Sequence, residues 1–443
     1  MRKMLLRLML LVGTILVSSL GIVSAQSKTV VTYWTWNAAA YANPGEMVDG
    51  QPSVSFAQEA FEAAHPEIDL DVKIFPYSDY LNQLQLNMAA GTGPDIVALQ
   101  AGVLLNTYSE FLTDLTPRAT TEWGDKLVDR FLALGLDQSR NAKGLVGLPL
   151  MNSAAGFLWY NKTIFDKDGL KPPTTWDEWI ATSKALKDKG TIGFFHGAAD
   201  SWVNLDMIIS IANELAPGKI YDAEAGKIPW TDSDLVKAMD IWKQMFSNGI
   251  MQEGALAATQ YPDTHQNFTS GKAGMMLMGV WNDFSVLTKA GFEGSQKGYG
   301  FTENYEYGTI PFPDLNGDGK PGVPFGGPDV IVAMNQSSQK QDAAWTVLSW
   351  MVSEDGQKQQ AKLLNVPSIK GVPFDDSDAK SDFAKQVLAD QITQLETASG
   401  KREFIYPDLK TAISDALQSV AAGQQTPEEA MAAIEAVSQT VKR

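Results

Sequence analysis

The sequence of 443 residues contains no cysteine and only three histidines. The lack of cysteine excludes disulfides, thiolate metal sites, cysteine nucleophiles and a lipid-modified N-terminal cysteine. His65, His196 and His265 do not form an H-E-x-x-H motif, and the sequence has neither a G-x-S-x-G nucleophile elbow nor a G-x-x-x-x-G-K-[ST] phosphate loop. The sequence therefore gives little sign of an enzyme, and any ATP hydrolysis would belong to a partner.

Basic residues are also scarce, with 35 Lys and Arg against 52 Asp and Glu, for a net charge of −17. No basic tract interrupts this balance. An acidic surface repels nucleic acid and anionic lipid, so binding to either is not expected.

Long hydrophobic runs are missing beyond the N-terminus. There, Arg2-Lys3 precede the apolar run Leu8–Val17, and Val23-Ser24-Ala25 supply small residues before Gln26. This order predicts a secretory signal peptide over residues 1–25. The alternative, an uncleaved anchor, is disfavoured because the apolar run is shorter than the ~20 residues that span a bilayer. We expect an exported protein, periplasmic or secreted, with a mature net charge near −20.

What the sequence has in abundance is aromatic and apolar residues, with 12 Trp, 12 Tyr and 19 Phe and 44% hydrophobic residues overall. The length suggests two domains. From Thr29 onward, strand and helix patterns alternate, for example Val30–Trp36, Tyr77–Ala90, Ile96–Leu99 and Met275–Met278. This alternation predicts an α/β fold with mainly parallel sheets.

The stretch from Gly147 to Trp179 combines several of these signals. Gly156–Tyr160 is a short apolar strand pattern, and Thr175 with Glu178 forms a T-x-x-E capping box at a helix start. A second box, Thr426-Pro427-Glu428-Glu429, predicts the start of the last helix.

Seven segments resemble, in order, those of bacterial extracellular solute-binding proteins of the maltose-binding-protein-like group, which deliver sugars to ABC importers. These are YWTW, FEAAHPEIDLDV, GTGPDIVAL, GFLWYNKTIFDKDGLKPPTTWDEW, FTSGKAGMMLMGVW, GGPDVIVAMNQSSQKQDAAWTVLSWM and GQQTPEEAM. The resemblance implies two lobes around a ligand cleft, joined by three crossing segments. It places lobe 1 at residues 26–152 plus 329–366 and lobe 2 at residues 153–328 plus 367–443.

The resemblance also implies where the ligand is bound. Sugar recognition uses aromatic faces for the rings, with amides and carboxylates for the hydroxyls. Trp281, which matches the cleft tryptophan of the family, is the best candidate, and Asn282 and Asp283 either bind hydroxyls or cap the next helix. The other candidate ligand-binding residues lie at strand ends, loops and crossings: Trp36, Asn37, Tyr41 (as a lid aromatic), Gln100, Asn152, Asp200, Trp202, Gly326 and Gly327.

A metal site is suggested weakly by Asp314-Leu315-Asn316-Gly317-Asp318-Gly319, which resembles the first half of a calcium loop. Position 12 of such a loop is Phe325 instead of glutamate, and no flanking helices are suggested. A turn held by Asp and Asn side chains is therefore the favoured interpretation.

Together these observations predict a non-enzymatic, monomeric, carbohydrate-binding component of an ABC importer, without a cofactor and with permease subunits as partners. Two alternatives stay open. One is a secreted glycoside hydrolase or lyase with a carboxylate pair. The other is a binding protein for a polyol or glycerol-phosphate-type solute, which would require Arg or Lys in the cleft.

Overall fold

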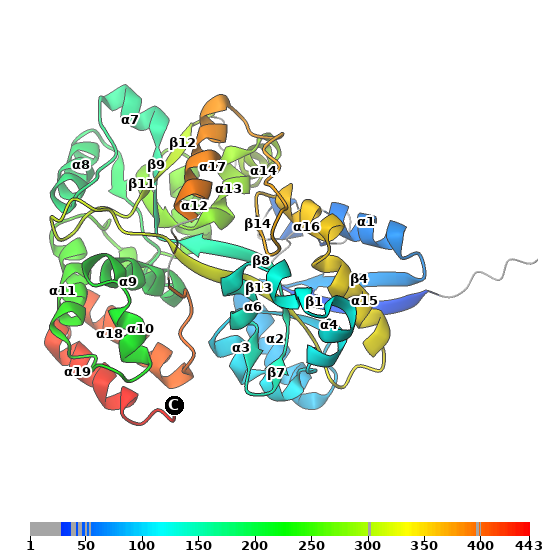
Figure 1. Ribbon diagram of the computed structural model, residues 1–443. Coiled ribbons are helices and arrows are strands. Elements are labelled where there is room, and N and C mark those ends of the chain that lie inside the picture. The colour runs from blue at the N-terminus through cyan, green and yellow to red at the C-terminus, as the bar shows by residue number, and fades with distance from the viewer. Residues whose placement is uncertain are drawn as a thin grey trace, which may run out of the picture.

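The computed structural model describes residues 28–36, 41–42, 47–48, 51–52, 55–299, 303–395, 398 and 400–443. The predicted signal peptide lies outside these residues. Figure 1 shows two α/β lobes with two long strands between them. The prediction of a two-lobe α/β fold is therefore confirmed.

Lobe 1 is built on a six-stranded sheet in the order β14-β8-β13-β5-β1-β4. Its strands are β1 (Thr29–Thr35), β4 (Ile68–Ile74), β5 (Ile96–Leu99), β8 (Leu148–Ala155), β13 (Phe325–Met334) and β14 (Val366–Pro367). The helices of this lobe are α1 (Phe56–Ala64), α2 (Tyr77–Ala90), α3 (Val103–Thr107), η1 (Ser109–Phe111), α4 (Thr116–Trp123), α5 (Lys126–Arg130), α6 (Ala133–Gln138), α15 (Gln341–Met351) and α16 (Glu354–Ala361).

Lobe 2 is built on a four-stranded sheet in the order β10-β11-β9-β12. Its strands are β9 (Phe157–Asn161), β10 (Ile192–Phe194), β11 (Ala273–Met278) and β12 (Tyr307–Pro311). The longer helices are α7 (Lys162–Asp168), α8 (Trp176–Asp188), α9 (Ser201–Leu215), α10 (Lys219–Glu224), α11 (Ser233–Ser247), α14 (Lys289–Tyr299), α17 (Asp382–Leu395), α18 (Pro407–Ala421) and α19 (Pro427–Ser438).

Short elements complete the chain. They are the paired strands β2 (Met47–Val48) with β3 (Gln51–Pro52) and β6 (Arg140–Asn141) with β7 (Gly144–Leu145), and the short helices η2 (Ala255–Ala257), η3 (Gln260–Thr264), α12 (His265–Thr269), η4 (Val280–Asn282) and α13 (Asp283–Leu287). Within the described residues, no helix has the length and apolar character needed to cross a membrane.

The prediction of mainly parallel sheets is wrong, because both sheets are mixed. β1 is parallel to β4 and β5, but β13 runs antiparallel to both β5 and β8. In lobe 2, β9 runs antiparallel to β11 and to β12. Two strands enter their sheets from the opposite lobe, β9 from lobe 1 and β13 from lobe 2, and both run against their neighbours.

The lobes are joined through a ribbon of two strands, β8 and β13, which pair from Leu148 with Val332 to Ala155 with Phe325. β8 continues through Gly156 into β9, and the chain returns from β12 to β13. A third connection follows β14 and leads to α17. The residue boundaries of the lobes and the positions of the three crossings stay a prediction.

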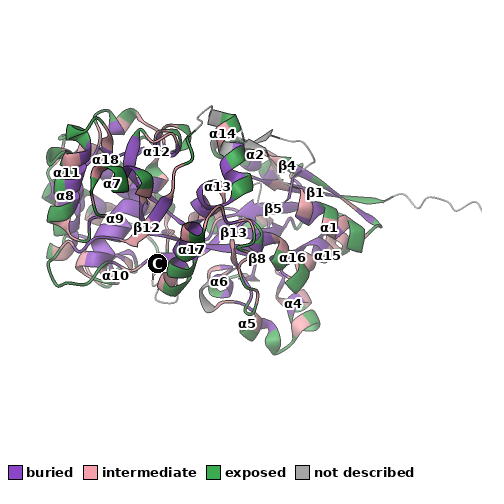
Figure 2. Cartoon of the chain, turned by 90° about the horizontal axis from the view of Figure 1, so that it is seen from above, coloured by how far each residue is buried: buried purple, intermediate pink, exposed green. Residues whose placement is uncertain are grey.

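Each sheet is covered on both faces by apolar side chains, and the strands form the buried interior in Figure 2. In β1, Val31 and Tyr33 face one core and Trp34 packs against the other. In β9, Leu158 faces one core of lobe 2, and Phe157 and Trp159 face the other. The alternation of strand side chains thus explains why β9 is apolar at successive positions.

Several predicted element ends agree with the structure. α2 and β5 have the predicted bounds, and the capping box at Thr426 and Glu429 is complete. The box before α8 is only half formed. The Thr175 hydroxyl accepts a hydrogen bond from the Glu178 N–H, but the Glu178 carboxylate turns to the N–H and hydroxyl of Thr174.

Candidate functional site

A small polar pocket lies between the lobes. Both lobes, the ribbon and the segment between α17 and α18 contribute to its wall. The lining residues are Gln100, Ala101, Gln138, Ser153, Gly327, Pro328, Asp329, Arg402 and Glu403. Its position at the carboxyl end of β5, beside the lobe junction, is typical of ligand sites in open α/β sheets.

Glycine allows the backbone to come close at this junction. A Cβ atom on Gly327 would lie 2.4 Å from the Gln138 Nε2, and one on Gly326 would lie 2.2 Å from the Ser153 carbonyl oxygen. Across the cleft, Gly102 has a φ of +77°, and a Cβ there would lie 2.6 Å from the Phe404 carbonyl oxygen. Gly102, which follows the lining residue Ala101 of lobe 1, therefore contacts the chain segment of lobe 2 that contains Phe404.

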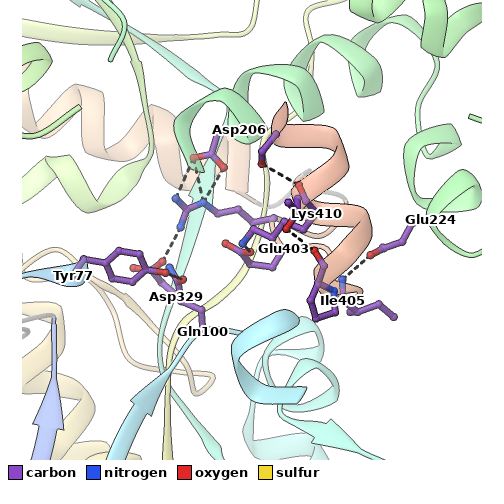
Figure 3. A network of polar contacts seen from close by, with 12 residues as sticks. Tyr77, Gln100, Asp206, Glu224, Asp329, Glu403, Ile405 and Lys410 are labelled. Atoms are coloured by element: carbon purple, nitrogen blue, oxygen red, sulfur yellow. Dashed lines mark hydrogen bonds and ion pairs between the residues drawn. The ribbon is translucent and has the colours of Figure 1, made fainter. Parts of the chain in front are cut away.

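Arg402 forms the charged centre of the site, where it bonds to Asp206 and Asp329, which Figure 3 labels. Its Nε donates to both carboxylate oxygens of Asp206 at 3.0 and 3.3 Å, and its Nη2 donates to Asp206 Oδ2 at 3.0 Å. Its Nη1 donates to Asp329 Oδ1 at 2.8 Å. The three side chains are only 11%, 5% and 9% exposed, so this is a buried ion cluster and not a surface pair.

The sheet geometry explains why Asp329 reaches Arg402. The β8–β13 ladder is regular from Phe325 to Pro328, but it shifts register between Pro328 and Val330 and again between Val330 and Ile331. A bulge of this kind re-aims a side chain, and here it places the Asp329 carboxylate at the pocket wall.

Burial and charge act in opposite directions in this cluster. Burial raises the pKa of Asp206 to about 6, although Arg402 lowers it, and burial also raises the pKa of Asp329. For Arg402, burial acts to lower the pKa, but the two carboxylates outweigh it and the pKa lies above its ordinary value. The guanidinium therefore stays charged at any pH at which the protein is folded.

The segment that carries Arg402 is itself held in place by ion pairs and hydrogen bonds (Figure 3). Glu403 pairs with Lys410 of α18 at 2.5 Å, and the Ile405 N–H donates to Glu224 Oε1 at 2.6 Å. On the opposite wall, the Tyr77 hydroxyl donates to Gln100 Oε1 at 2.7 Å. The polar side chains of the pocket are thus positioned from both lobes.

An aromatic group lies behind Arg402 in lobe 2. The guanidinium carbon is 4.1 Å from the ring centroid of Trp281 and 5.7 Å from that of Trp202. Trp202 meets Trp281 edge-on at 6.1 Å and stacks with Tyr261 at 6.3 Å. These are the distances of cation–π and aromatic contacts.

Trp281 was the leading candidate from the sequence, and its position differs from the expected one. It is partly exposed, so it is not sealed in the core, and it lies next to the site. However, it is not a lining residue, because the Arg402 guanidinium covers its ring.

Three predicted ligand-binding residues are buried and do not line the pocket, so their contact with a ligand stays a prediction. Tyr41 is 0% exposed and packs edge-on against Tyr33 and Trp350. Asn282 is buried and its Oδ1 accepts a hydrogen bond from Ser285. Asp283 is buried and accepts one from Gln391 Nε2 at 3.0 Å.

Four further predicted residues lie at or near the pocket. Gln100 and Gly327 line it, and Gly326 lies beside Gly327 in β13. Asn152 is buried in β8, where its Nδ2 donates to the Pro367 carbonyl oxygen at 3.4 Å, so it serves the third crossing.

Asp200 and Trp36 lie outside the pocket lining. Asp200 Oδ2 accepts from the Gln260 N–H at 2.7 Å, which positions η3. Trp36 packs on Tyr77 and Tyr80 at the edge of lobe 1. Asn37 lies outside the described residues.

The Asp314–Gly319 segment forms the predicted turn. The Asp314 carboxylate accepts hydrogen bonds from the N–H groups of Asn316, Gly317 and Gly319. Because these donors stabilise its charged form, the pKa of Asp314 is lowered.

The family model for bacterial extracellular solute-binding proteins matches residues 44–358. Among curated proteins, the chain is 24% identical over 383 residues to the galactooligosaccharide-binding protein of Bacillus subtilis, which covers 85% of this chain and 83% of that protein. Among solved structures, a chitin oligosaccharide binding protein is similar with a TM-score of 0.73 and 22% identity, covering 93% of this chain and 98% of the other. Maltose-bound MalE3 of T. maritima is similar with a TM-score of 0.71 and 19% identity, covering 93% and 99%.

Proposed function

Because the chain belongs to the family of bacterial extracellular solute-binding proteins, we propose that it captures a carbohydrate outside the cytoplasm and delivers it to the permease of an ABC importer. The names of relatives support a carbohydrate ligand, since they include binding proteins for galactooligosaccharides and for melibiose, raffinose and stachyose. The observation that carries the proposal is the pocket at the lobe junction, which both lobes line with hydrogen-bonding side chains.

The chemistry of the pocket suits the hydroxyl groups of a neutral sugar. Gln100 and Gln138 offer amides, Ser153 offers a hydroxyl, and Asp329 and Glu403 offer carboxylate oxygens. Arg402 has five N–H donors, of which three bond to the two aspartates in the described part of the chain. The other two are available to a ligand in the pocket.

A phosphorylated ligand is disfavoured, although the site contains an arginine. The positive charge of Arg402 is already shared by Asp206 and Asp329, and Glu403 adds a further carboxylate at the wall. A phosphate group would meet these negative charges in a poorly solvated site.

The positions of the carboxylates also favour binding over catalysis. Asp206 and Asp329 both bond to the same guanidinium, whereas a glycosidase needs one free carboxylic acid and one free carboxylate on opposite sides of the sugar. We therefore propose a non-enzymatic protein that acts as a monomer without a cofactor. Nucleic acid is not a partner in this proposal, because the net charge is −17.

The proposed mechanism is closure of the lobes. A sugar that bonds to Gln100 of lobe 1 and to Arg402 of lobe 2 stabilises the closed state, and the permease recognises that state. In this mechanism Trp281 supports the Arg402 guanidinium from behind, and the sugar contacts the polar side of the arginine.

Calorimetric titration with mono- to tetrasaccharides tests the proposal, combined with X-ray scattering to follow closure. We expect saturable binding of at least one neutral sugar with a decrease in the radius of gyration. The variant Gln100→Ala should weaken that binding at least about tenfold, because it removes a hydrogen-bonding amide from the site. Absence of binding across the panel, or turnover of the sugar, would contradict the proposal.

A further inference from the structure

The hydrogen-bonding groups of the pocket differ in whether the protein itself supplies their partners. Gln100 Oε1 accepts from the Tyr77 hydroxyl at 2.7 Å, and Asp329 Oδ1 accepts from Arg402 Nη1 at 2.8 Å. The Nε2 atom of Gln138, in contrast, is buried, and no group among the described residues accepts a hydrogen bond from it. Gln138 therefore presents a free donor at the pocket wall.

A buried donor without a partner destabilises the folded protein. Its N–H groups have lost their hydrogen bonds to water, and only another acceptor restores what was lost. Because Gln138 lines the pocket, a ligand in the pocket can supply this acceptor. Binding of such a ligand would remove the unfavourable contribution.

Close contact with the strand ribbon fixes the position of the Gln138 amide. Gln138 is the last residue of α6, and a Cβ on Gly327 would lie 2.4, 2.8 and 2.9 Å from its Nε2, Oε1 and Cδ atoms. All three atoms of the amide thus lie against the backbone of β13, where a residue other than glycine would displace them. The donor is held at the strand that joins the lobes.

Gln357 has the arrangement expected of a glutamine with a structural role. It is 0% exposed, and its Nε2 donates to the carbonyl oxygens of Leu150 and Met351 at 2.7 and 2.9 Å. Its Oε1 accepts from the Ser368 N–H at 2.7 Å. The protein satisfies both ends of this amide, whereas it leaves the Nε2 of Gln138 without an acceptor in the described part of the chain.

We propose that Gln138 is a specificity-determining residue of the pocket and that its Nε2 donates a hydrogen bond to one oxygen atom of the bound carbohydrate. This inference rests on the proposed function. A hydroxyl group suits the position, because Asp329 and Glu403 line the same pocket and offer carboxylate oxygens that can accept its proton. A sugar without an oxygen there would leave the amide unpartnered and would bind more weakly.

Thermal unfolding of the full chain without sugar tests whether the donor is unpartnered. Gln138→Met keeps the length of the side chain and removes the donor, so we expect a melting temperature higher by about 1 °C or more. Gln357→Met is the matched control, and its melting temperature should fall because the variant loses hydrogen bonds that the folded protein makes. A fall for Gln138→Met as large as that for Gln357→Met would overturn the inference.

Calorimetry tests the contact with the ligand. The probe is the sugar of the mono- to tetrasaccharide panel that binds the parent protein most tightly. Gln138→Met and Gln138→Glu both lack a side-chain N–H, so each should raise the dissociation constant of this sugar at least about tenfold. Gln58→Met, which changes a glutamine of α1 outside the pocket lining, should leave the dissociation constant unchanged.

Monodeoxy analogues of the same sugar identify the oxygen that Gln138 contacts. One analogue should bind the parent at least about tenfold more weakly than the sugar does, because it lacks that oxygen. Gln138→Met should bind this analogue and the sugar with similar affinity, since the two changes remove the same hydrogen bond. A purely structural role for Gln138 would not produce this selective loss.

The inference is overturned if Gln138→Met and Gln138→Glu bind the sugar as tightly as the parent does. It is also overturned if every monodeoxy analogue loses the same affinity in the parent and in Gln138→Met. Failure of the proposed function gives a different result, because the parent itself would then bind no sugar of the panel. In that case the melting temperatures of the sugar-free variants decide whether Gln138 is an unpartnered donor.

Discussion

Two buried carboxylates of lobe 2 have opposite surroundings. Asp206, in the cleft, meets the guanidinium of Arg402 on one side and shares it with Asp329. Asp283, in the contact between α13 and α17, accepts a hydrogen bond from the side-chain amide of Gln391. Burial raises the pKa of both, but for Asp206 the value is about 6, whereas that of Asp283 lies well above its ordinary value.

The buried acids at these two places have different roles. In the cleft, the protein keeps an ionised cluster that can offer polar groups to a ligand. In the helix contact, burial raises the pKa of the acid, and its carboxyl group accepts a hydrogen bond within the core. The two sites differ because Asp206 bonds to an arginine and Asp283 to an amide. Substitutions at either site should therefore change stability or sugar binding in a predictable direction.

The largest effect is expected from Arg402→Ala, which leaves Asp206 and Asp329 buried without a counter-charge. We expect a loss of about 3–5 kcal/mol in the free energy of unfolding, together with loss of sugar binding. Urea denaturation and calorimetry measure the two effects. In Arg402→Lys the charge remains but the bidentate geometry is lost, so its stability should lie between those of the parent and Arg402→Ala.

Asp283→Asn should increase stability at neutral pH. The folded state holds the Asp283 proton more tightly than the unfolded state. The stabilisation from this proton is complete below the unfolded pKa, which is near 3.9. It is lost as the pH rises towards the folded pKa. Each unit of that difference is worth about 1.4 kcal/mol at pH 7. The asparagine variant should lack this part of the pH dependence.

Urea denaturation at several pH values between 4 and 8 checks this expectation. If the variant is less stable than the parent at pH 7, Asp283 is ionised in the folded protein at that pH, and the hydrogen bond from Gln391 stabilises its charge. Sugar binding serves as the control, and it should be unchanged because Asp283 lies outside the pocket lining.

Trp281→Phe should weaken sugar binding moderately, by about 0.5–2 kcal/mol, because phenylalanine gives the guanidinium a weaker aromatic surface. Since Arg402 and not Trp281 lines the pocket, the variant should change affinity by displacing Arg402. In the Arg402→Lys variant, the additional change Trp281→Phe should weaken sugar binding less than it does in the parent protein. Equal losses in both backgrounds, measured by calorimetry, would argue for direct stacking of the sugar on Trp281.

The smallest effect on stability is expected from Asp329→Asn, about 1 kcal/mol in either direction. Asp206 makes most of the contacts to Arg402 and can balance its charge alone, and the pKa of Asp329 is already raised by burial. Thermal unfolding measures the change. A loss as large as that of Arg402→Ala would mean that both aspartates are needed to keep the guanidinium in place.

The sequence allowed a good prediction of the elements that depend on neighbouring residues. The bounds of α2 follow from the spacing of its apolar residues and from Gly91, which ends the helix in the left-handed conformation with a φ of +70°. β5 follows from four consecutive apolar residues after a Gly-Pro-Asp turn. The two-lobe architecture came from ordered motifs and could not be derived from any one of them.

The site was predicted only in part, because its central residue depends on distant ones. Arg402 lies in a loop with no motif, and its partner Asp206 is 196 residues away in the sequence. A charged run of Lys401, Arg402 and Glu403, shortly before a helix that starts at Pro407, was the only local signal. The burial of Tyr41 was missed for a similar reason: its position after a strand suggested the cleft, but contacts with Trp350 bury it.

The bulge at Asp329 has a mechanical consequence. Asp329 belongs to the strand pair that connects the lobes, while Arg402 is anchored to α9 and α18 in lobe 2. Any torsion of the strand pair that swings the lobes apart must therefore lengthen a charged contact, so opening works against electrostatic attraction. Because this contact is buried, dissolved salt screens it little and should hardly change the balance between the open and closed shapes.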